Sequence, residues 1–366
     1  MSYKILTHNE AIEKVYKLTP QIREYDEFMY LGVRWLPYTM FFHHANYKSK
    51  VINTDALGFR VSESQGNFFS TANFDNSKKI NLLVGGSTVL GTGATADKFT
   101  ISSKLAEKTG EIWLNFSGRG YNSIQEYLLF LMHMNKFDQI NNVVIFSGIN
   151  TLSLEGFPDH LSTEHGRYYY SYEFSHYMEK YNSDLKRRKN TYASELDDRS
   201  KSNFQSIKAL ISKLFIDEDN PVDIVLSDEN VDTTLRVHRA AEAITNAIKV
   251  WKLLLAPYNT KLTFILQPMS YWSKSSFTND ELDIFHAIDS CPNNFWRMFG
   301  KILGEEVHIP FADHIRSRCD DLEVKFLDMN ELLKDSEIIN EYIFVDHVHF
   351  NDKGYDEIAK LITKFL

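Results

Sequence analysis

The sequence predicts an α/β protein, a three-layer αβα sandwich in which helices cover both faces of a parallel sheet. From Ile80 onward, short apolar segments alternate with amphipathic segments of helical period, which is typical of parallel sheets. Each apolar segment is followed by small or polar residues. In open parallel sheets, binding and catalytic residues lie at these carboxyl ends of the strands. With 366 residues, 43% of them hydrophobic, the chain can bury a large core.

Residues 1–77 are predicted to be an N-terminal extension packed on the sheet domain. This segment is irregular and rich in aromatic residues, with one or two helices, one of them over Asn9–Leu18. Gly58 lies between apolar residues in INTDALGFRVS and indicates a turn into a short strand. The apolar stretch Tyr30–Phe42 is too short to span a bilayer. We expect it to pack in the core, with contact to a membrane surface as the alternative.

Residues 78–366 are predicted to form the sheet domain. The predicted strands are Ile80–Val84, Glu111–Phe116, Asn142–Phe146, Lys261–Leu266 and Val324–Leu327, and the predicted helices are Lys98–Lys108, Ser123–Met134, Thr233–Leu255 and Asp352–Phe365. A segment at about 152–232 interrupts the alternation. Because the strand pattern resumes after it, we interpret this segment as an insertion.

Charge and cysteine content exclude several classes of protein. The net charge of -9 argues against a nucleic-acid binder, which needs a clustered positive field. Cys291 and Cys319 are too few for a disulfide framework, which suits a reducing compartment. The opening segment MSYKILTHNEAIEKVYKL lacks the apolar core of a signal peptide. We therefore expect a cytoplasmic protein without membrane insertion, and its oligomeric state is open.

The segment KKINLLVGGSTVLGTG has three possible interpretations. A phosphate-binding P-loop would need a lysine and a Ser or Thr after its last glycine, where Thr92-Gly93 stand instead. A dinucleotide-binding turn could be formed by Gly91-x-Gly93-x-x-Ala96, but the predicted strand has already ended at Gly85. The third interpretation is a serine nucleophile, Ser87, presented between a strand and a helix. It is favoured, and no cofactor is expected.

A serine nucleophile needs a base, which the end of the chain provides. Asp346 and His349 are three residues apart, just before the helix predicted from Asp352. Within one turn the carboxylate can accept a hydrogen bond from His349 Nδ1 while Nε2 faces Ser87. The motif is not the Gly-x-Ser-x-Gly elbow of the common α/β-hydrolase fold, because Val89 takes the last place.

Four motifs together resemble a known family. In order and spacing they are similar to the four blocks of the SGNH (GDSL-type) hydrolases, across Lys79–Leu366: Gly85-Gly86-Ser87-Thr88, Asn115-x-x-x-x-Gly120, Gly148-x-Asn150 and Asp346-x-x-His349. The resemblance implies a flavodoxin-like sandwich and ester hydrolysis or acyl transfer. It also implies roles for single residues: Ser87 as nucleophile, Asp346 and His349 as the rest of a triad, and an oxyanion hole made by the Ser87 N–H, the Gly120 N–H and the Asn150 side chain.

The motifs depart from the family pattern at three places. Gly86 replaces the aspartate of Gly-Asp-Ser-Leu, and such Gly-Gly-Ser variants resemble relatives from polysaccharide-modification systems. Ser117 stands where many members have glycine, which favours Gly120 over Gly118 as the donor. Thr151 follows Asn150 where an aspartate is frequent. The first departure favours a glycan ester as substrate.

The sequence therefore predicts a serine-dependent esterase that removes an acetyl or other acyl group from a carbohydrate. Two alternatives remain open: an O-acyltransferase to a sugar hydroxyl that uses the same triad, and a non-catalytic binding protein on the same fold. A metal site is not expected, because neither Asp346 with His347 and His349 nor His43-His44 has further ligands at a recognisable spacing.

Three further features have open interpretations. The tyrosine run Tyr168–Tyr172 could stack on sugar rings or pack the insertion against the sheet. The basic run Lys186–Lys189 is expected to be a solvated face, with binding of an anionic substrate as the alternative. The tryptophans Trp251, Trp272 and Trp296 are expected in the core or at a pocket wall.

Overall fold

The computed structural model describes residues 6–32, 34–157, 166–169, 178–187, 232–290 and 299–366. It divides into two compact units, one of Met1–Gly156 with Asp232–Leu366 and one of Phe157–Val231. In the second unit the described residues include a helix at 178–187. The boundaries that the sequence suggested for the extension and the insertion stay predictions.

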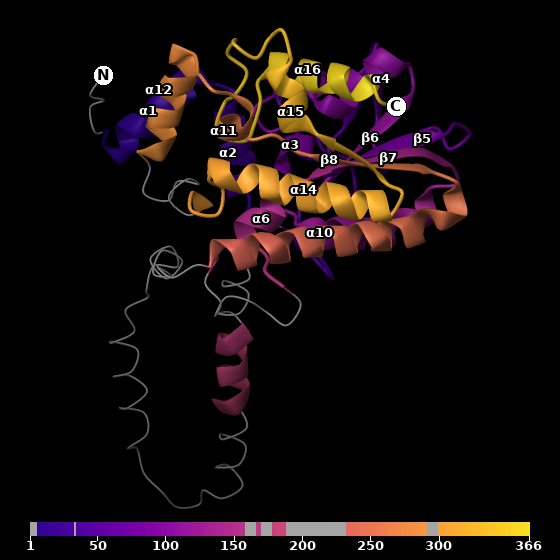
Figure 1. Cartoon of the computed structure of the whole chain (residues 1–366). Coiled ribbons are helices and arrows are strands. Elements are labelled where there is room, and N and C mark those ends of the chain that lie inside the picture. Colours follow the sequence, from indigo (N-terminus) through magenta and orange to yellow (C-terminus); the bar gives the residue numbers. More distant parts are fainter. Residues whose placement is uncertain (1–5, 33, 158–165, 170–177, 188–231, 291–298) are drawn as a thin grey trace, which may run out of the picture. The chain divides into compact units, whose positions relative to one another are not determined.

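A five-stranded parallel sheet forms the centre of the first unit (Figure 1). Its strands are β5 (Ile80–Gly85), β6 (Ile112–Ser117), β7 (Ile140–Ser147), β8 (Lys261–Leu266) and β9 (Lys325–Asp328). All five predicted strands are confirmed, because each coincides with one of these within two residues at either end. All six residues of β5 are buried, as expected of a central parallel strand covered on both faces.

The order of the strands determines which loops meet. That order is β6-β5-β7-β8-β9. The first strand of this sheet in the sequence, β5, therefore lies between the second, β6, and the third, β7. Flavodoxin-like sheets have this order, and their ligands bind where the direction of winding changes, beside the first strand. Residues that follow β5 therefore lie between those that follow β6 and β7.

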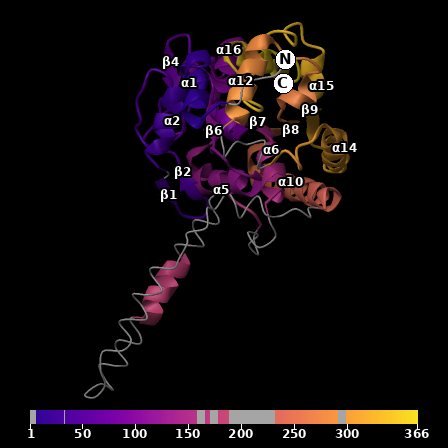
Figure 2. The ribbon, with the colours of Figure 1, turned by 90° about the vertical axis from the view of Figure 1, so that its left-hand side faces the viewer.

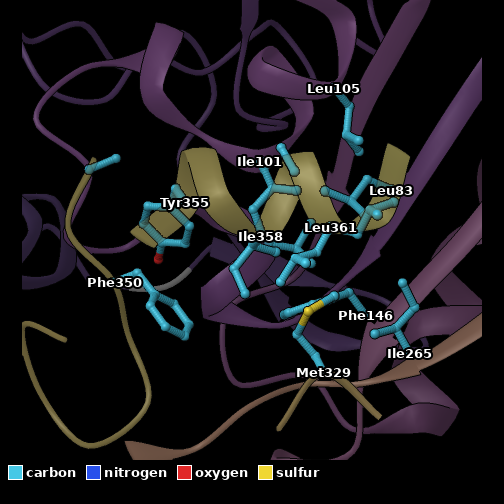
Figure 3. Close-up of a cluster of buried hydrophobic side chains, with 14 of the residues drawn as sticks. Leu83, Ile101, Leu105, Phe146, Ile265, Met329, Phe350, Tyr355, Ile358 and Leu361 are labelled. Carbon is cyan, nitrogen blue, oxygen red and sulfur yellow. The ribbon is translucent and has the colours of Figure 1, made fainter. Parts of the chain in front are cut away.

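Helices cover both faces of the sheet, which confirms the predicted three layers (Figure 1). One face carries α4 (Ile101–Thr109), α15 (Met329–Lys334) and α16 (Asp352–Thr363), and the other carries α5 (Ser123–His133), α10 (Thr233–Leu255) and α14 (Glu305–Asp321). Side chains from alternate strand positions, among them Leu83, Phe146 and Ile265, pack with residues of α4 and α16 in one buried cluster (Figure 3).

The predicted helices are confirmed, with differences at their ends. The helix expected from Lys98 begins instead at Ile101, because Asp97–Phe99 form a 3-10 turn (η1) and the Thr100 side chain caps α4 by accepting the Ser103 N–H. Helix α14 was not predicted, since Pro310 interrupts its pattern. The other described elements of the sheet domain are α3 (Ser87–Leu90), α6 (Ile149–Glu155), α11 (Ser270–Ser273), α12 (Asn279–Asp289), η2 (Met134–Lys136) and η4 (Ala256–Tyr258).

The extension is more regular than the sequence indicated. It contains α1 (His8–Leu18), which confirms the expected helix, α2 (Ile22–Tyr30), and two hairpins, β1 (Arg34–Leu36) with β2 (Met40–Phe42) and β3 (Ser62–Ser64) with β4 (Asn67–Phe69). Figures 1 and 2 both draw α1 beside α12, where Lys14 forms an ion pair with Asp283.

A buried arginine joins the extension to the segment that follows β5. Arg60 is fully buried and pairs with Asp97 at 2.8 Å. Its guanidinium also donates to the carbonyl oxygens of Leu90 and Gly91, at the end of α3. Removing one partner of such a pair typically costs about 3–5 kcal/mol, because the other charge stays buried. The extension thus contributes directly to the stability of α3.

Two further expectations concern apolar residues. Trp251 and Trp272 are buried, as predicted, and Trp296 lies outside the described residues. Within the described part of the chain, every helix is too short or too polar to cross a lipid bilayer.

Candidate functional site

Ser87 is the first residue of α3, directly after the Gly85-Gly86 pair that ends β5. Gly85 allows a close approach to the neighbouring strand β7, and Gly86 allows a close approach to the Asn150 side chain of α6. A Cβ atom on Gly85 would lie 2.2 Å from the Phe146 carbonyl oxygen, and one on Gly86 would lie 2.5 Å from Asn150 Nδ2. A side chain at position 85 would therefore clash with the backbone of β7, whereas one at position 86 would have to displace the end of the Asn150 side chain.

The structure brings Ser87, His349 and Asp346 together. The Ser87 Oγ lies 2.7 Å from His349 Nε2, and His349 Nδ1 lies 2.6 Å from Asp346 Oδ2. An ionised carboxylate can only accept, so Nδ1 carries the proton and Nε2 accepts the Ser87 hydroxyl. In this arrangement the serine oxygen can become a nucleophile as its proton passes to the imidazole.

The Asp346 carboxylate is held by its own turn. Its Oδ1 accepts the backbone N–H groups of Val348 at 2.8 Å and His349 at 2.7 Å. The turn is closed by the Val345 N–H, which donates to the His349 carbonyl oxygen at 2.9 Å. Burial by itself would raise the pKa of Asp346, but His349 and these hydrogen bonds lower that pKa to about 2. The carboxylate therefore stays ionised at neutral pH and orients the imidazole.

The segment that leads to Asp346 is anchored on α11 and α12. Lys274 and Glu281 form a buried ion pair at 2.8 Å. The Glu281 Oε1 also accepts the N–H groups of Ile343 and Phe344, at 3.2 Å each. His347 lies against Phe285 and bonds Asp289 through Nε2 at 2.8 Å. His347 thus belongs to the anchor of the loop and not to the contact with Ser87.

The turn after β6, residues 118–121, carries the predicted donor Gly120. The Gly118 N–H donates to the Gly85 carbonyl oxygen, and the Tyr121 N–H donates to the Gly118 carbonyl oxygen, both at 3.0 Å. The Arg119 N–H donates to His43 Nε2 at 3.0 Å. Gly120, at the third position of the turn, has φ 71°, as a type II turn requires. Within the described ranges no acceptor takes up the Gly120 N–H, which leaves it available to a ligand.

The Asn150 side chain lies beside the same turn. Asn150 is the second residue of α6, just after the end of β7, and its Nδ2 donates to the Tyr121 carbonyl oxygen at 2.9 Å. The residue that caps α6 is Gly148, so Asn150 does not act as the helix cap. The second N–H of the amide finds no acceptor in the described part of the chain, and the amide lies close to Gly86.

Two other motif residues have structural contacts. Asn115 donates through Nδ2 to the Val89 carbonyl oxygen at 2.7 Å and so joins β6 to α3. Asn351, and not Asp346, caps α16 by accepting the Gly354 N–H, as its position before the helix indicates.

Sequence reasoning missed three groups that support the site. Gln267 follows β8 and donates through Nε2 to Thr88 Oγ1 at 3.3 Å. Its position at a strand end was the signal that could have found it. His43 contacts the 118–121 turn through the Arg119 N–H, and the Tyr121 hydroxyl of that turn contacts the Phe41 carbonyl oxygen of β2. No local sequence pattern predicts either contact.

Histidines and carboxylates lie close enough to hold a metal at two other places among the described residues. These groups are His238 with Glu242 and His314, and His308 with Asp328 and Glu331. Neither group contains the histidines considered from the sequence. The tyrosine run is described at Tyr168 and Tyr169 only, and the basic run at Lys186 and Arg187 only, so both interpretations stay predictions.

No family model and no curated protein matches the chain. Solved structures that match include a GDSL-like lipase from Bacteroides thetaiotaomicron VPI-5482, with 12% identity and a TM-score of 0.41 over 80% of this chain and 92% of that one. An acetyl xylan esterase matches with 12% identity and a TM-score of 0.37, over 78% and 98% of the two chains. A lipase/acylhydrolase from Enterococcus faecalis matches with 11% identity and a TM-score of 0.35, over 78% and 94%. GDSL-type structures are thus among the matches, as the four motifs predicted.

Proposed function

We propose that this chain is a serine-dependent ester hydrolase in which Ser87, His349 and Asp346 act as nucleophile, base and orienting acid. The observation that carries the proposal is the continuous line of hydrogen bonds from Ser87 Oγ through the His349 ring to Asp346, with distances of 2.7 and 2.6 Å. Ser87 and His349 are 262 residues apart in the sequence. A turn that served only the local backbone would not require a partner from so distant a segment in this geometry.

The reaction follows from the geometry. As Ser87 Oγ attacks the ester carbonyl, His349 Nε2 takes the hydroxyl proton, and Asp346 stabilises the resulting imidazolium. The developing oxyanion is stabilised by the N–H groups of Ser87 and Gly120 and by the Asn150 amide. His349 then returns the proton to the leaving alcohol, and an acyl-serine remains. Water, activated by the same imidazole, releases the acid and regenerates Ser87.

We propose a carbohydrate ester, acetylated or otherwise acylated, as the substrate. This part rests on the Gly-Gly-Ser resemblance in the first motif. A panel of acetylated sugars, with acetate release as the readout, tests it. Addition of a sugar acceptor distinguishes water from a second hydroxyl as the group that resolves the acyl-serine.

The experiment that tests the catalytic assignment is reaction with a serine-directed fluorophosphonate, read by intact-protein mass. We expect one adduct on the wild type and none on Ser87→Ala. Ser290→Ala is the matched control: its hydroxyl donates to the His286 carbonyl oxygen at the end of α12, so this variant should react like the wild type. An unmodified wild type would contradict the proposal and favour a binding protein.

A further inference from the structure

The extension contains a buried histidine, His43, directly after β2. Its Nδ1 lies 3.1 Å from the Gly58 carbonyl oxygen and its Nε2 lies 3.0 Å from the Arg119 backbone nitrogen. A carbonyl oxygen can only accept and a backbone N–H can only donate. Nδ1 therefore carries the proton, and Nε2 accepts through its lone pair. This contact requires the neutral imidazole.

The surroundings keep His43 neutral and in place. The side chain is 7% exposed, and its ring stacks on Phe42 with centroids 4.6 Å apart. Burial lowers the pKa of His43 to about 3, although the hydrogen bond to Gly58 opposes this shift. The acceptor on Nε2 is therefore present throughout the neutral pH range.

The acceptor on His43 Nε2 is important because it binds the backbone of the 118–121 turn. Type I and type II turns differ by rotation of their central peptide unit, here the one between Arg119 and Gly120. That rotation would turn the Gly120 N–H to the other side of the backbone. His43 fixes the preceding peptide by accepting the Arg119 N–H. Arg119 is half-buried, so loss of this acceptor costs at most the roughly 1–3 kcal/mol that is typical of a buried N–H, and it removes the contact that favours the observed turn.

The same part of the extension holds the turn at two further places. The Tyr121 hydroxyl donates to the Phe41 carbonyl oxygen. Gln125, the third residue of α5, donates through Nε2 to the Thr39 carbonyl oxygen at 2.8 Å. Residues 39–43 thus contact the 118–121 turn and the start of the following helix, and His43 provides the contact nearest to Gly120.

We propose that His43 is a positioning residue of the site: by accepting the Arg119 N–H, it holds the 118–121 turn in the form that directs the Gly120 N–H to the substrate oxygen. The inference rests on the proposed function, since Gly120 is an oxyanion donor only if Ser87 attacks a carbonyl. It means that the extension contributes to the rate of ester hydrolysis as well as to the stability of the fold.

Three variants test the inference with p-nitrophenyl acetate as the substrate. His43→Phe keeps a ring but has no acceptor. His43→Gln can accept the Arg119 N–H through Oε1 and donate to Gly58 through Nε2. His44→Phe is the control, because His44 is only partly buried and bonds the Leu31 carbonyl oxygen, away from the 118–121 turn.

We expect His43→Phe to lower kcat by at least about 10-fold, up to the roughly 10²–10³-fold expected for loss of one oxyanion donor, with KM nearly unchanged. His43→Gln should recover most of that kcat, and His44→Phe should equal the wild type. Wild-type kcat in His43→Phe, or an equal loss of kcat in both His43 variants, would overturn the inference, because a merely structural role does not distinguish Gln from Phe.

Amide hydrogen exchange provides a readout that does not depend on activity. Exchange in residues 118–121 should be faster in His43→Phe than in the wild type and close to wild type in His43→Gln. Equal exchange in all three would contradict the positioning role even if Ser87 proves reactive. A wild type that neither hydrolyses the ester nor reacts with fluorophosphonate would instead contradict the proposed function, while exchange still tests whether His43 holds the turn. If His43→Phe does not fold, kcat and the exchange of residues 118–121 are compared between His43→Gln and the wild type alone. A large loss of kcat in His43→Gln would then overturn the inference.

Discussion

The Asn150 amide is held in one orientation by a hydrogen bond and still has a second N–H that can donate to a substrate. One N–H of its amide is used by the Tyr121 carbonyl oxygen at 2.9 Å, which sets the plane of the amide. The amide then lies beside Gly86, the residue before Ser87. A donor that is oriented in advance needs no reorganisation when charge develops on the substrate oxygen.

We therefore predict that Asn150→Ala lowers kcat by about 10²–10³-fold, with little change in KM, because the donor acts mainly in the transition state. Steady-state kinetics on a small ester measure this. Asn81→Ala is the control: Asn81 is likewise an amide that forms hydrogen bonds, but it is buried at the other end of β5, where it donates to Glu111. It should lose stability and keep kcat. Similar kinetic losses in both variants would contradict the assignment.

Among single residues, the sequence predicted best those whose chemistry is local. Asp346 and His349 lie in one turn, so their spacing alone indicated the contact of 2.6 Å between them. His43 was considered as a metal ligand, and its contact with Arg119 bridges residues 76 positions apart. No periodicity or turn signal reports such a pair, because the bond exists only once the extension is packed.

At the scale of elements, α5 and β7 share a buried carboxyl group. Glu126 of α5 is 1% exposed, and its Oε1 accepts the hydroxyl of Ser147, the last residue of β7, at 2.6 Å. Burial raises the pKa of Glu126 to about 8, against the lowering effect of that hydrogen bond. The folded chain thus keeps a neutral carboxylic acid between a helix and the strand that leads to Asn150.

This pair predicts a pH dependence of stability. In the unfolded chain the group titrates near 4.5, whereas the folded chain keeps its proton up to about pH 8. The stability that Glu126 contributes is therefore complete below pH 4.5 and is lost as pH rises to about 8. At about 1.4 kcal/mol per pKa unit, the loss amounts to at most about 5 kcal/mol.

Glu126→Gln cannot ionise and should lack this loss. Urea unfolding at pH 5 and pH 8 measures it: the free energy of unfolding of the wild type should fall, relative to the variant, at the higher pH. Glu331→Gln is the control, because Glu331 is exposed and pairs with Lys334 on the surface. A constant difference between wild type and Glu126→Gln at both pH values would show that Glu126 is ionised in the folded state.

The accuracy of the element predictions followed burial. The strands are continuous apolar runs because both faces of the sheet are covered, and such runs are easily recognised. Helix α10 was predicted with its bounds, since its apolar stripe is long and regular. Helix α14 and the hairpins of the extension were missed, because Pro310 breaks the first pattern and strands of three residues are too short to show a period.

At the scale of the whole molecule, the two units are joined where the chain leaves α6 and enters α10. The Glu155 carbonyl oxygen accepts from Arg236 Nη1 at 2.9 Å, and the Glu155 carboxylate pairs with Arg239 at 3.1 Å. The end of α6 and the start of α10 are therefore neighbours within the first unit. All the residues placed in the proposed site belong to that unit.

We predict that a short Gly/Ser linker of about six residues can replace residues 157–231, because a flexible chain of that length spans neighbouring helix ends. The shortened chain should unfold cooperatively and react with fluorophosphonate at the rate of the full chain. The rates at which the full and the shortened chain hydrolyse acetylated sugars are then compared. A lower rate in the shortened chain would show that the second unit contributes to the use of sugar esters. A shortened chain that folds but does not react at Ser87 would show that the site needs the second unit.

The sequence by itself determined the strands, the class of fold and the residues of the proposed triad, because buried apolar runs and single-turn motifs are local properties of the chain. The cytoplasmic location and the glycan substrate stay predictions. Only the tertiary structure decided which loops become neighbours. The order β6-β5-β7 places Ser87 between Gly120 and Asn150, and the packing of the extension adds Arg60 and His43. Hydrogen bonds between distant segments depend on how buried surfaces fit together, and that fit leaves no period in the sequence.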